Sequence, residues 1–319
     1  MRALSSIVYS ALILSVGSAI AACSGVGNTM SSTLDRQTAA IGSRIGSTVA
    51  RNSASGALLY VSGRSAHIVT MYTYPKLQFV ARLAAGRYPM GLCVDPRTQD
   101  VWVVSQTNGN EAKLLQFAHG EVTPIRTIKT DSSAETCAVD PVTGNLAVAV
   151  TNLSEDPGTL LVCKHSTGRP KSYNLKGLLL YLFVGYDSKG TLYVDGTPAG
   201  SSMPVRIGQL SPGDKELRLV RLHTKLFYPG NVQSDGTDLA IGQERRPTIY
   251  RINGSRIVGT VALNGACFVQ QFYIHGNRVI VPNTCGSQST INIYAYPSGG
   301  NPLRTFNPLF APFGAAIST

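Results

Sequence analysis

Short apolar segments recur along this chain at intervals of about 40 to 47 residues. Each one follows a tight polar turn and has the length of a single β-strand. The segments are Leu58–Ser62, Val101–Ser105, Leu146–Val150, Leu192–Gly196, Leu239–Gln243 and Val279–Asn283. Such a regular spacing indicates one structural unit that is repeated along the chain.

Each unit carries signals for four strands. An apolar inner strand ends in a turn such as Asp140–Asn145, where Asp, Pro, Gly and Asn supply the hairpin chemistry. The recurring segment is the second strand, and a third strand and a more polar fourth strand, such as Glu216–Val220, complete the unit. Four-stranded repeats of forty-odd residues are typical of β-propeller blades. The sequence therefore predicts an all-β, six-bladed β-propeller over residues 56–319.

The two ends of the repeat region indicate how the ring closes. The first blade begins at its second strand, because only a polar stretch precedes Leu58. The chain ends in Pro312–Ile317, which echoes the inner strand Pro89–Val94. We therefore predict that the C-terminal strand joins the first blade as its inner strand, which removes an open sheet edge.

The N-terminus reads as a targeting segment. The apolar run Ile7–Ile20 is too short to cross a membrane. It leads into Ile20–Cys23, which resembles a bacterial lipobox, where the signal peptidase cuts before the cysteine and the thiol receives a lipid. The resemblance implies a signal peptide over residues 1–22 and lipidation of Cys23. The alternative is an ordinary secretory signal with Cys23 near the cut.

Residues 23–55 are rich in Ser, Thr, Gly and Ala and lack strand alternation. This composition predicts a flexible tether between the lipid and the folded domain. The chain is thus expected outside the cytoplasm, in the periplasm or at the cell surface, anchored to the membrane through its lipid.

The charge of the chain limits its partners. The formal net charge is +11, and removing Arg2 with the leader leaves 27 Lys and Arg against 17 Asp and Glu, a net charge of +10. The basic residues are scattered, which favours weak attraction to anionic lipids or cell-wall polymers. Nucleic-acid binding would require a basic stripe with stacking aromatics, and it is not predicted. We expect a monomer with an envelope protein or a glycan as its ligand.

One disulfide is predicted from hairpin arithmetic. Cys267 and Cys285 lie at equal distances from the turn at Gly276, so they face each other across the hairpin. An oxidising compartment favours a bond between them, the alternative being two unrelated thiols.

The remaining cysteines are expected to be unpaired. Cys93 and Cys137 occupy nearly equivalent inner-strand positions in adjacent blades, so a disulfide between them is one alternative. Neighbouring inner strands are expected to diverge, and buried free thiols are therefore the favoured prediction. Cys163 has no evident partner, and no tight Cys/His spacing indicates zinc.

The pattern of reactive residues favours binding over catalysis. The five histidines map to separate turns and loops, and neither a Gly-x-Ser-x-Gly nor a His-Glu-x-x-His motif occurs. Repeated aspartates precede the second strands and are interpreted as turn caps. They are Asp95, Asp140, Asp187 and Asp235.

Ligand-binding candidates are the polar residues just after or at the ends of the second strands, where loops converge on the central channel. They are Arg64, Gln106, Asn108, Asn152, Glu155, Asp195, Gln243, Glu244 and Asn283.

The turns at Val139–Leu146 and Asp187–Leu192 resemble those of NHL-repeat and regucalcin/gluconolactonase-like six-bladed propellers, especially their bacterial lipoprotein versions. The resemblance covers about residues 56–319. It implies a divalent cation such as calcium at the upper channel mouth, for which Asn152, Asp195 and Asn283 are weak candidates. The family's first-blade glutamate is missing, since Ser62-Gly63-Arg64 stands there. The favoured hypothesis is therefore a binding scaffold, and the alternative is a metal-dependent lactonase-type hydrolase or lyase.

Overall fold

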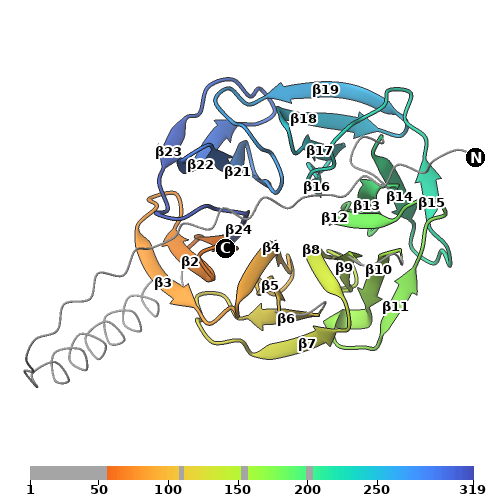
Figure 1. Cartoon of the computed structure of the whole chain (residues 1–319), viewed down its shortest axis with the longest axis horizontal. Helices are drawn as coiled ribbons and strands as arrows, with labels where there is room; N and C mark the ends of the chain where they lie inside the picture. The colour runs from red at the N-terminus through yellow and green to blue at the C-terminus, as the bar shows by residue number, and fades with distance from the viewer. Residues whose placement is uncertain (1–55, 108–110, 152–156, 199–203) are drawn as a thin grey trace, which may run out of the picture. The chain divides into compact units, whose positions relative to one another are not determined.

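The computed structural model describes residues 56–107, 111–151, 157–198 and 204–319. They belong to one compact unit, residues 43–319. Six antiparallel four-stranded sheets stand around a common axis as the blades of a propeller (Figure 1). In the described residues the helical content is a single turn of 3₁₀ helix, η1 (Lys164–Ser166). The predicted all-β, six-bladed propeller is confirmed.

We name the blades A to F in ring order and give the strands of each from the axis outward. Blade A contains β24 (Gly314–Ser318), β1 (Leu58–Gly63), β2 (Ile68–Thr73) and β3 (Phe79–Leu83). Blade B contains β4 (Tyr88–Val94), β5 (Val101–Gln106), β6 (Ala112–Phe117) and β7 (Arg126–Thr130). Blade C contains β8 (Ser133–Val139), β9 (Leu146–Thr151), β10 (Thr159–Cys163) and β11 (Pro170–Tyr173). Blade D contains β12 (Leu180–Tyr186), β13 (Leu192–Thr197), β14 (Arg206–Leu210) and β15 (Arg218–Val220). Blade E contains β16 (Val232–Ser234), β17 (Leu239–Gln243), β18 (Arg246–Asn253) and β19 (Arg256–Ala262). Blade F contains β20 (Tyr273–His275), β21 (Arg278–Cys285), β22 (Gln288–Ala295) and β23 (Arg304–Phe306).

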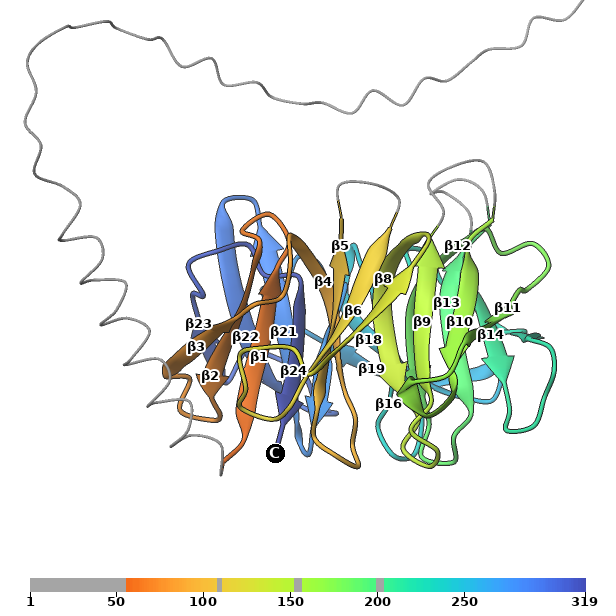
Figure 2. The same cartoon turned by 90° about the horizontal axis from the view of Figure 1, so that it is seen from below.

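The two ends of the channel differ in what surrounds them. In blades B to F, the turns that join the inner strand to the second strand lie on one side of the ring, which we call the lower face (Figure 2). The loops between second and third strands lie on the opposite, upper face. The chain ends at the lower face, after β24.

The core lies between blades, which explains why the recurring segments carry apolar residues on both faces of the strand. In β1, Leu58 and Tyr60 pack toward blade B, whereas Leu59 and Val61 pack toward blade F. All six residues of β1, β5 and β9 are buried. A strand that is buried on both faces needs an unbroken hydrophobic run, and each large side chain contributes roughly 1.5–3 kcal/mol on burial.

The ring closes as predicted, through the C-terminal strand. β24 pairs antiparallel with β1, from Leu58 opposite Ser318 to Ser62 opposite Gly314. On the lower face, the side chain of Gln99 from blade B accepts a hydrogen bond from the N–H of Thr319 at 2.8 Å. The end of the chain is thus also tied to blade B, independently of the pairing between β24 and β1.

A further latch joins the outer edges of blades F and A. The guanidinium of Arg304 donates to the carbonyl oxygens of Pro75 and Lys76, at 2.6 and 3.0 Å. These residues form the turn after β2, so the latch links β23 to the neighbouring blade.

The repeated aspartates cap the lower turns, as the sequence indicated. In each turn the aspartate Oδ1 accepts the backbone N–H two residues further on, at 2.9 to 3.0 Å. These residues are Asp95, Asp140, Asp187 and Asp235. Their carboxylates fix the hairpins that return the chain to each second strand.

The predicted Cys267–Cys285 disulfide is present, with the two Cα atoms 5.4 Å apart. Because it closes a loop of fewer than twenty residues, it is worth about 3 kcal/mol in the chain-entropy view. Cys163 is free and buried, in agreement with the sequence reading.

The expectation of free thiols at Cys93 and Cys137 is wrong, because these residues form a second disulfide with a Cα separation of 5.6 Å. The bond can form because Gly91 has no side chain, which lets β4 approach β8 closely. A Cβ atom at Gly91 would lie 2.8 Å from the carbonyl oxygen of Glu135. The inner strands of blades B and C therefore converge where divergence was expected.

Removing β24 tests ring closure. A chain that ends at Pro312 should lose the single cooperative thermal transition, because blade A loses its inner strand and β1 gains an open edge. Circular dichroism melting measures this. Arg304→Ala, which breaks only the outer latch, should keep one transition. An unchanged sharp melt of the truncated chain would contradict this account of closure.

Candidate functional site

A cavity of about 440 Å³ occupies the lower half of the central channel. Inner strands from all six blades line it, together with lower-face turns at Pro96, Pro141 and Ser188. Its size falls within the range of about 300–1,000 Å³ that small-molecule sites occupy. The ligand-binding residues predicted from the sequence were expected at the opposite, upper mouth of the channel.

The lining of this cavity is apolar and neutral-polar. It contains no lysine and no arginine, and Asp187 is its one side-chain carboxylate. Oδ1 of Asp187 accepts the N–H groups of Lys189 and Thr191, at 2.9 and 2.8 Å. Burial lowers the pKa of His275, so this half-buried ring, which packs edge-on against Tyr74, is neutral at pH 7. The cavity therefore offers no positive charge to an anion.

A glutamine side chain spans the channel wall between blades F and B. Gln271 is buried, donates to the carbonyl oxygen of Leu92 at 2.9 Å and accepts the Leu92 N–H at 3.1 Å. The carboxamide passes over β24 at Gly314, where a Cβ atom would lie 2.1 Å from the Gln271 Oε1. Only glycine leaves room for this crossing.

A second glutamine makes the same kind of two-point contact. Gln233 of blade E donates to the carbonyl oxygen of Ile274 at 3.2 Å and accepts the Ile274 N–H at 2.8 Å. Beside it, Asn231 donates to the carbonyl oxygen of Phe272 at 2.6 Å. Side-chain amides therefore bond to the main chain of inner strands around the channel.

The upper mouth contains a carboxyl group that sequence reasoning missed. Glu135 stands at a bulge in β8, and its Oε1 accepts a hydrogen bond from Gln106 Nε2 at 3.3 Å. Burial raises its pKa to about 6, against the smaller opposing effects of the positive charge of Arg64 and the Gln106 hydrogen bond. Arg64 itself is exposed.

Two of the predicted ligand-binding residues connect neighbouring blades. Gln106 donates to the carbonyl oxygen of Ala134 in blade C at 3.1 Å. Asp195 is fully buried and accepts the N–H groups of Phe183 and Gly230, each at 3.1 Å, which links blades D and E. Burial raises the pKa of the Asp195 carboxyl, while these two N–H groups act in the opposite direction.

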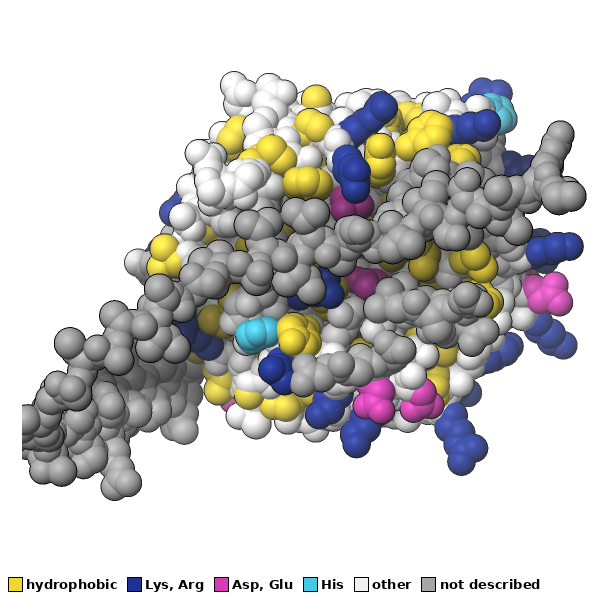
Figure 3. All heavy atoms as spheres, viewed as in Figure 1, with side chains coloured by type: hydrophobic (Ala, Val, Ile, Leu, Met, Phe, Trp, Pro, Cys, Tyr) yellow, Lys and Arg dark blue, Asp and Glu magenta, His cyan; other side chains and the backbone are white. Residues whose placement is uncertain are grey.

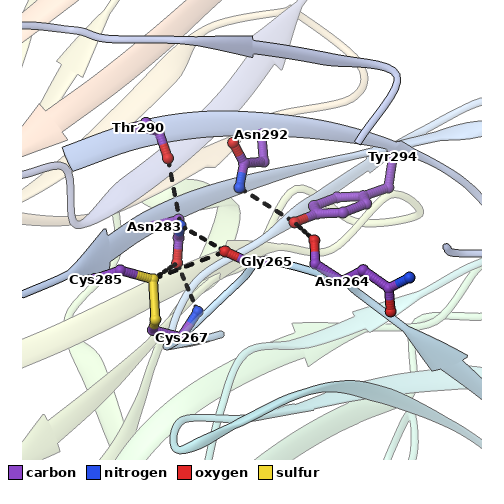
Figure 4. The surroundings of a disulfide bond; sticks show 8 residues. All are labelled: Asn264, Gly265, Cys267, Asn283, Cys285, Thr290, Asn292 and Tyr294. Atoms are coloured by element: carbon purple, nitrogen blue, oxygen red, sulfur yellow. Dashed lines mark hydrogen bonds between the residues drawn. A yellow bond between two sulfur atoms is a disulfide. The ribbon is translucent and has the colours of Figure 1, made fainter. Parts of the chain in front are cut away.

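Asn283 supports the Cys267–Cys285 disulfide (Figure 4). Its Oδ1 accepts the N–H of Cys267 at 2.8 Å, and its Nδ2 donates to the carbonyl oxygen of Gly265 at 3.3 Å. The side chain thus fixes the loop that leads into β20.

The other candidates do not form one cluster with these residues. On the upper face, Glu244 Oε1 accepts a hydrogen bond from Gln270 Nε2 at 3.0 Å. Gln243 is buried, and its Oε1 has no hydrogen-bond partner in the described part of the chain. Asn108, Asn152 and Glu155 lie outside the described residues.

The residues considered for a divalent cation are differently placed. Asp195 lies between blades D and E, whereas Asn283 contacts the loop before β20, and both side chains are hydrogen-bonded to the main chain. Asn152 lies outside the described residues. No group of three or more His, Cys, Asp or Glu side chains with metal-binding placement occurs in the ranges that the structure describes.

The sequence carried no signal for Gln233, Gln271 or Glu135. Each lies on an inner strand or directly before one, and its partner belongs to another blade. Figure 3 shows visible Lys and Arg side chains scattered over the face seen along the channel, with no continuous stripe among them.

Sequence comparisons leave the family open, because no protein-family model matches the chain and no curated protein is detectably similar to it. Solved structures resemble its fold. A chain of a nidogen/laminin complex has a TM-score of 0.67 at 14% identity, covering 83% of this chain and 99% of that chain. A protein of unknown function from Bacteroides caccae has a TM-score of 0.62 at 15% identity, covering 82% and 99%. The Cps50 (Swd1) β-propeller domain from Myceliophteria thermophila reaches 0.50 at 10%, covering 78% and 86%. These likenesses show the propeller fold.

The raised pKa of Glu135 predicts a pH dependence of stability. The folded state favours the neutral carboxyl, so this contribution is complete below pH 4.5 and is lost as the pH rises through about 6. Glu135→Gln should remove this loss, which amounts to at most about 2 kcal/mol. Urea unfolding between pH 4 and 7 measures it. Glu216→Gln, at an exposed position, should keep the wild-type slope, and a similar slope in Glu135→Gln would refute the assignment.

Proposed function

We propose that this chain is a lipid-anchored binding module of the bacterial cell envelope, with its ligand held on the propeller axis. The observation that carries the proposal is the cavity of about 440 Å³ that all six blades line. A rigid wall built by every blade suits recognition of one ligand, because little has to be ordered on binding.

The disulfides support the compartment. Cys93–Cys137 and Cys267–Cys285 both lie in the propeller, and disulfides persist in oxidising, extracytoplasmic compartments. Among the described residues, no helix combines the length and hydropathy that a bilayer crossing requires. The proposed anchor is the lipobox-like Ile20–Cys23, which precedes the described residues.

The cavity chemistry favours binding over turnover. A catalytic site pairs a nucleophile with a base within hydrogen-bond reach. In the cavity, the aspartate is committed to a turn and the histidine packs against Tyr74. Neither arrangement presents an activated group to a ligand.

The structural neighbours are compatible with this role, since one of them comes from a complex between proteins, nidogen/laminin. The relation to NHL-repeat and regucalcin-like lipoproteins is part of the proposal and rests on turn motifs such as Val139–Leu146.

Cys23→Ala tests the anchor. Without the thiol that receives the lipid, the full chain should move from the membrane fraction to the soluble extracytoplasmic fraction and lose labelling by a fatty-acid analogue. Cys163→Ala, which changes a buried free thiol in the propeller, should stay with the membrane. Membrane retention of unlabelled Cys23→Ala would contradict lipid anchoring.

Ligand binding is tested separately, with the purified full chain. A soluble digest of bacterial peptidoglycan, or an extract of envelope proteins, should raise the melting temperature saturably, because a ligand that binds the native state stabilises it. Mass spectrometry should find the added molecules chemically unchanged. The absence of a shift with both preparations, or conversion of either one, would contradict a binding module.

A further inference from the structure

The inner strands leave main-chain groups unpaired along the cavity wall. In an antiparallel pair, residues alternate between those that bond to the partner strand and those whose N–H and C=O point away from it. In blade B the N–H of Asp95 donates to the carbonyl oxygen of Asp100. The N–H and C=O groups of Val94 and Leu92 therefore point away from β5 and toward the axis.

The same alternation holds in the next three blades. The main-chain N–H groups of three aspartates donate to carbonyl oxygens across the turn: Asp140 to Asn145, Asp187 to Thr191 and Asp235 to Asp238. One residue before each aspartate, the main chain therefore faces the channel. With Val94, these residues are Val139, Tyr186 and Ser234, and all of them line the cavity. No hydrogen bond from elsewhere in the described chain reaches their N–H and C=O groups.

The protein itself shows what such an edge binds. Leu92 and Ile274 are also edge residues, and each is occupied by the carboxamide of a glutamine, which meets the N–H and the C=O of one residue together. A primary carboxamide has a donor and an acceptor side by side, which matches this spacing. A carboxylate has no donor for the C=O, and the lining contains no lysine or arginine to neutralise it.

We propose that the strand edges of the lower cavity that no protein group pairs with bind a neutral primary carboxamide, as in an Asn or Gln side chain or a small free amide. This inference rests on the proposed function, for which it names the site and the chemistry of the ligand. The carboxamide takes the place on Val94, Val139, Tyr186 or Ser234 that Gln271 takes on Leu92.

The test uses matched probes on the full chain, followed by NMR line broadening and thermal shift. Propionamide is compared with propionate, and acetyl-Gly-Gln-Gly-N-methylamide with acetyl-Gly-Glu-Gly-N-methylamide and acetyl-Gly-Ala-Gly-N-methylamide, whose caps contain no primary carboxamide. The amide member of at least one pair should bind at least tenfold more tightly than its acid. Binding of propionamide indicates a free amide as the source, and binding of the Gln peptide alone indicates a peptide. Equal binding of Gln and Ala peptides, or of acid and amide, would overturn the proposal.

Two variants locate the binding. Ser188 is exposed at the cavity rim, and Ser188→Trp should weaken binding at least tenfold by filling the entrance. Lys189→Trp is the control, because the neighbouring Lys189 lines two interblade grooves and does not line this cavity. Equal affinities of the two variants would place the amide elsewhere and refute the site.

A third variant opens an occupied position. Gln233→Ala removes the carboxamide from Ile274, so propionamide should raise its melting temperature by more than it raises that of the wild type. An equal rise would argue against recognition by the strand edge. If all carboxamides fail while the peptidoglycan digest still stabilises the chain, this inference falls and the binding module stands.

Discussion

The structure depends on one constraint, which is that six sheets must share an axis without pairing to one another there. Each inner strand bonds to its own blade on one side and faces the channel on the other. Unpaired main-chain groups are costly when they are buried and tolerable when water or a polar side chain reaches them. The architecture therefore requires an open channel. The N–H and C=O groups of the inner strands face this channel whatever side chains the strands carry.

The polar side chains near the axis follow from this constraint. Gln233 and Asn231 bond to the main chain at the inner edge of blade F, and Gln271 bonds to the inner edge of blade B. Gln106 and Asp195 link the upper ends of adjacent blades. These side chains therefore hold neighbouring blades together near the axis. A ligand site would use the same residue types, so the sequence alone does not separate the two roles.

Much of the fold was predictable because it depends on short-range sequence patterns. The spacing of the apolar segments, the aspartate turns and the echo of Pro89–Val94 at Pro312–Ile317 depend on near neighbours in the chain or on repetition. The Cys267–Cys285 bond was predictable for the same reason, since the two residues lie at equal distances from one turn, although Cys267 belongs to the loop before β20 and not to the strand pair itself.

The candidate site was much less predictable. The Cys93–Cys137 bond depends on how closely two blades approach at Gly91, which no single repeat encodes. Gln271 lies 179 residues from its partner Leu92, and sequence pattern says nothing about that distance. The polar residues that follow the second strands lie toward the upper mouth, whereas inner strands and lower-face turns line the cavity at the lower end.

The position of β1 has a mechanical consequence. Its two neighbours, β2 and β24, both run antiparallel to it, so β1 is held by hydrogen bonds along both edges. A pull on the chain ahead of Leu58, directed along the strand, would load these bonds in parallel and force them to yield together. Tension applied along the chain ahead of Leu58 would therefore be resisted by both strand pairings of β1 at once, and would not peel one strand at a time from the edge of blade A.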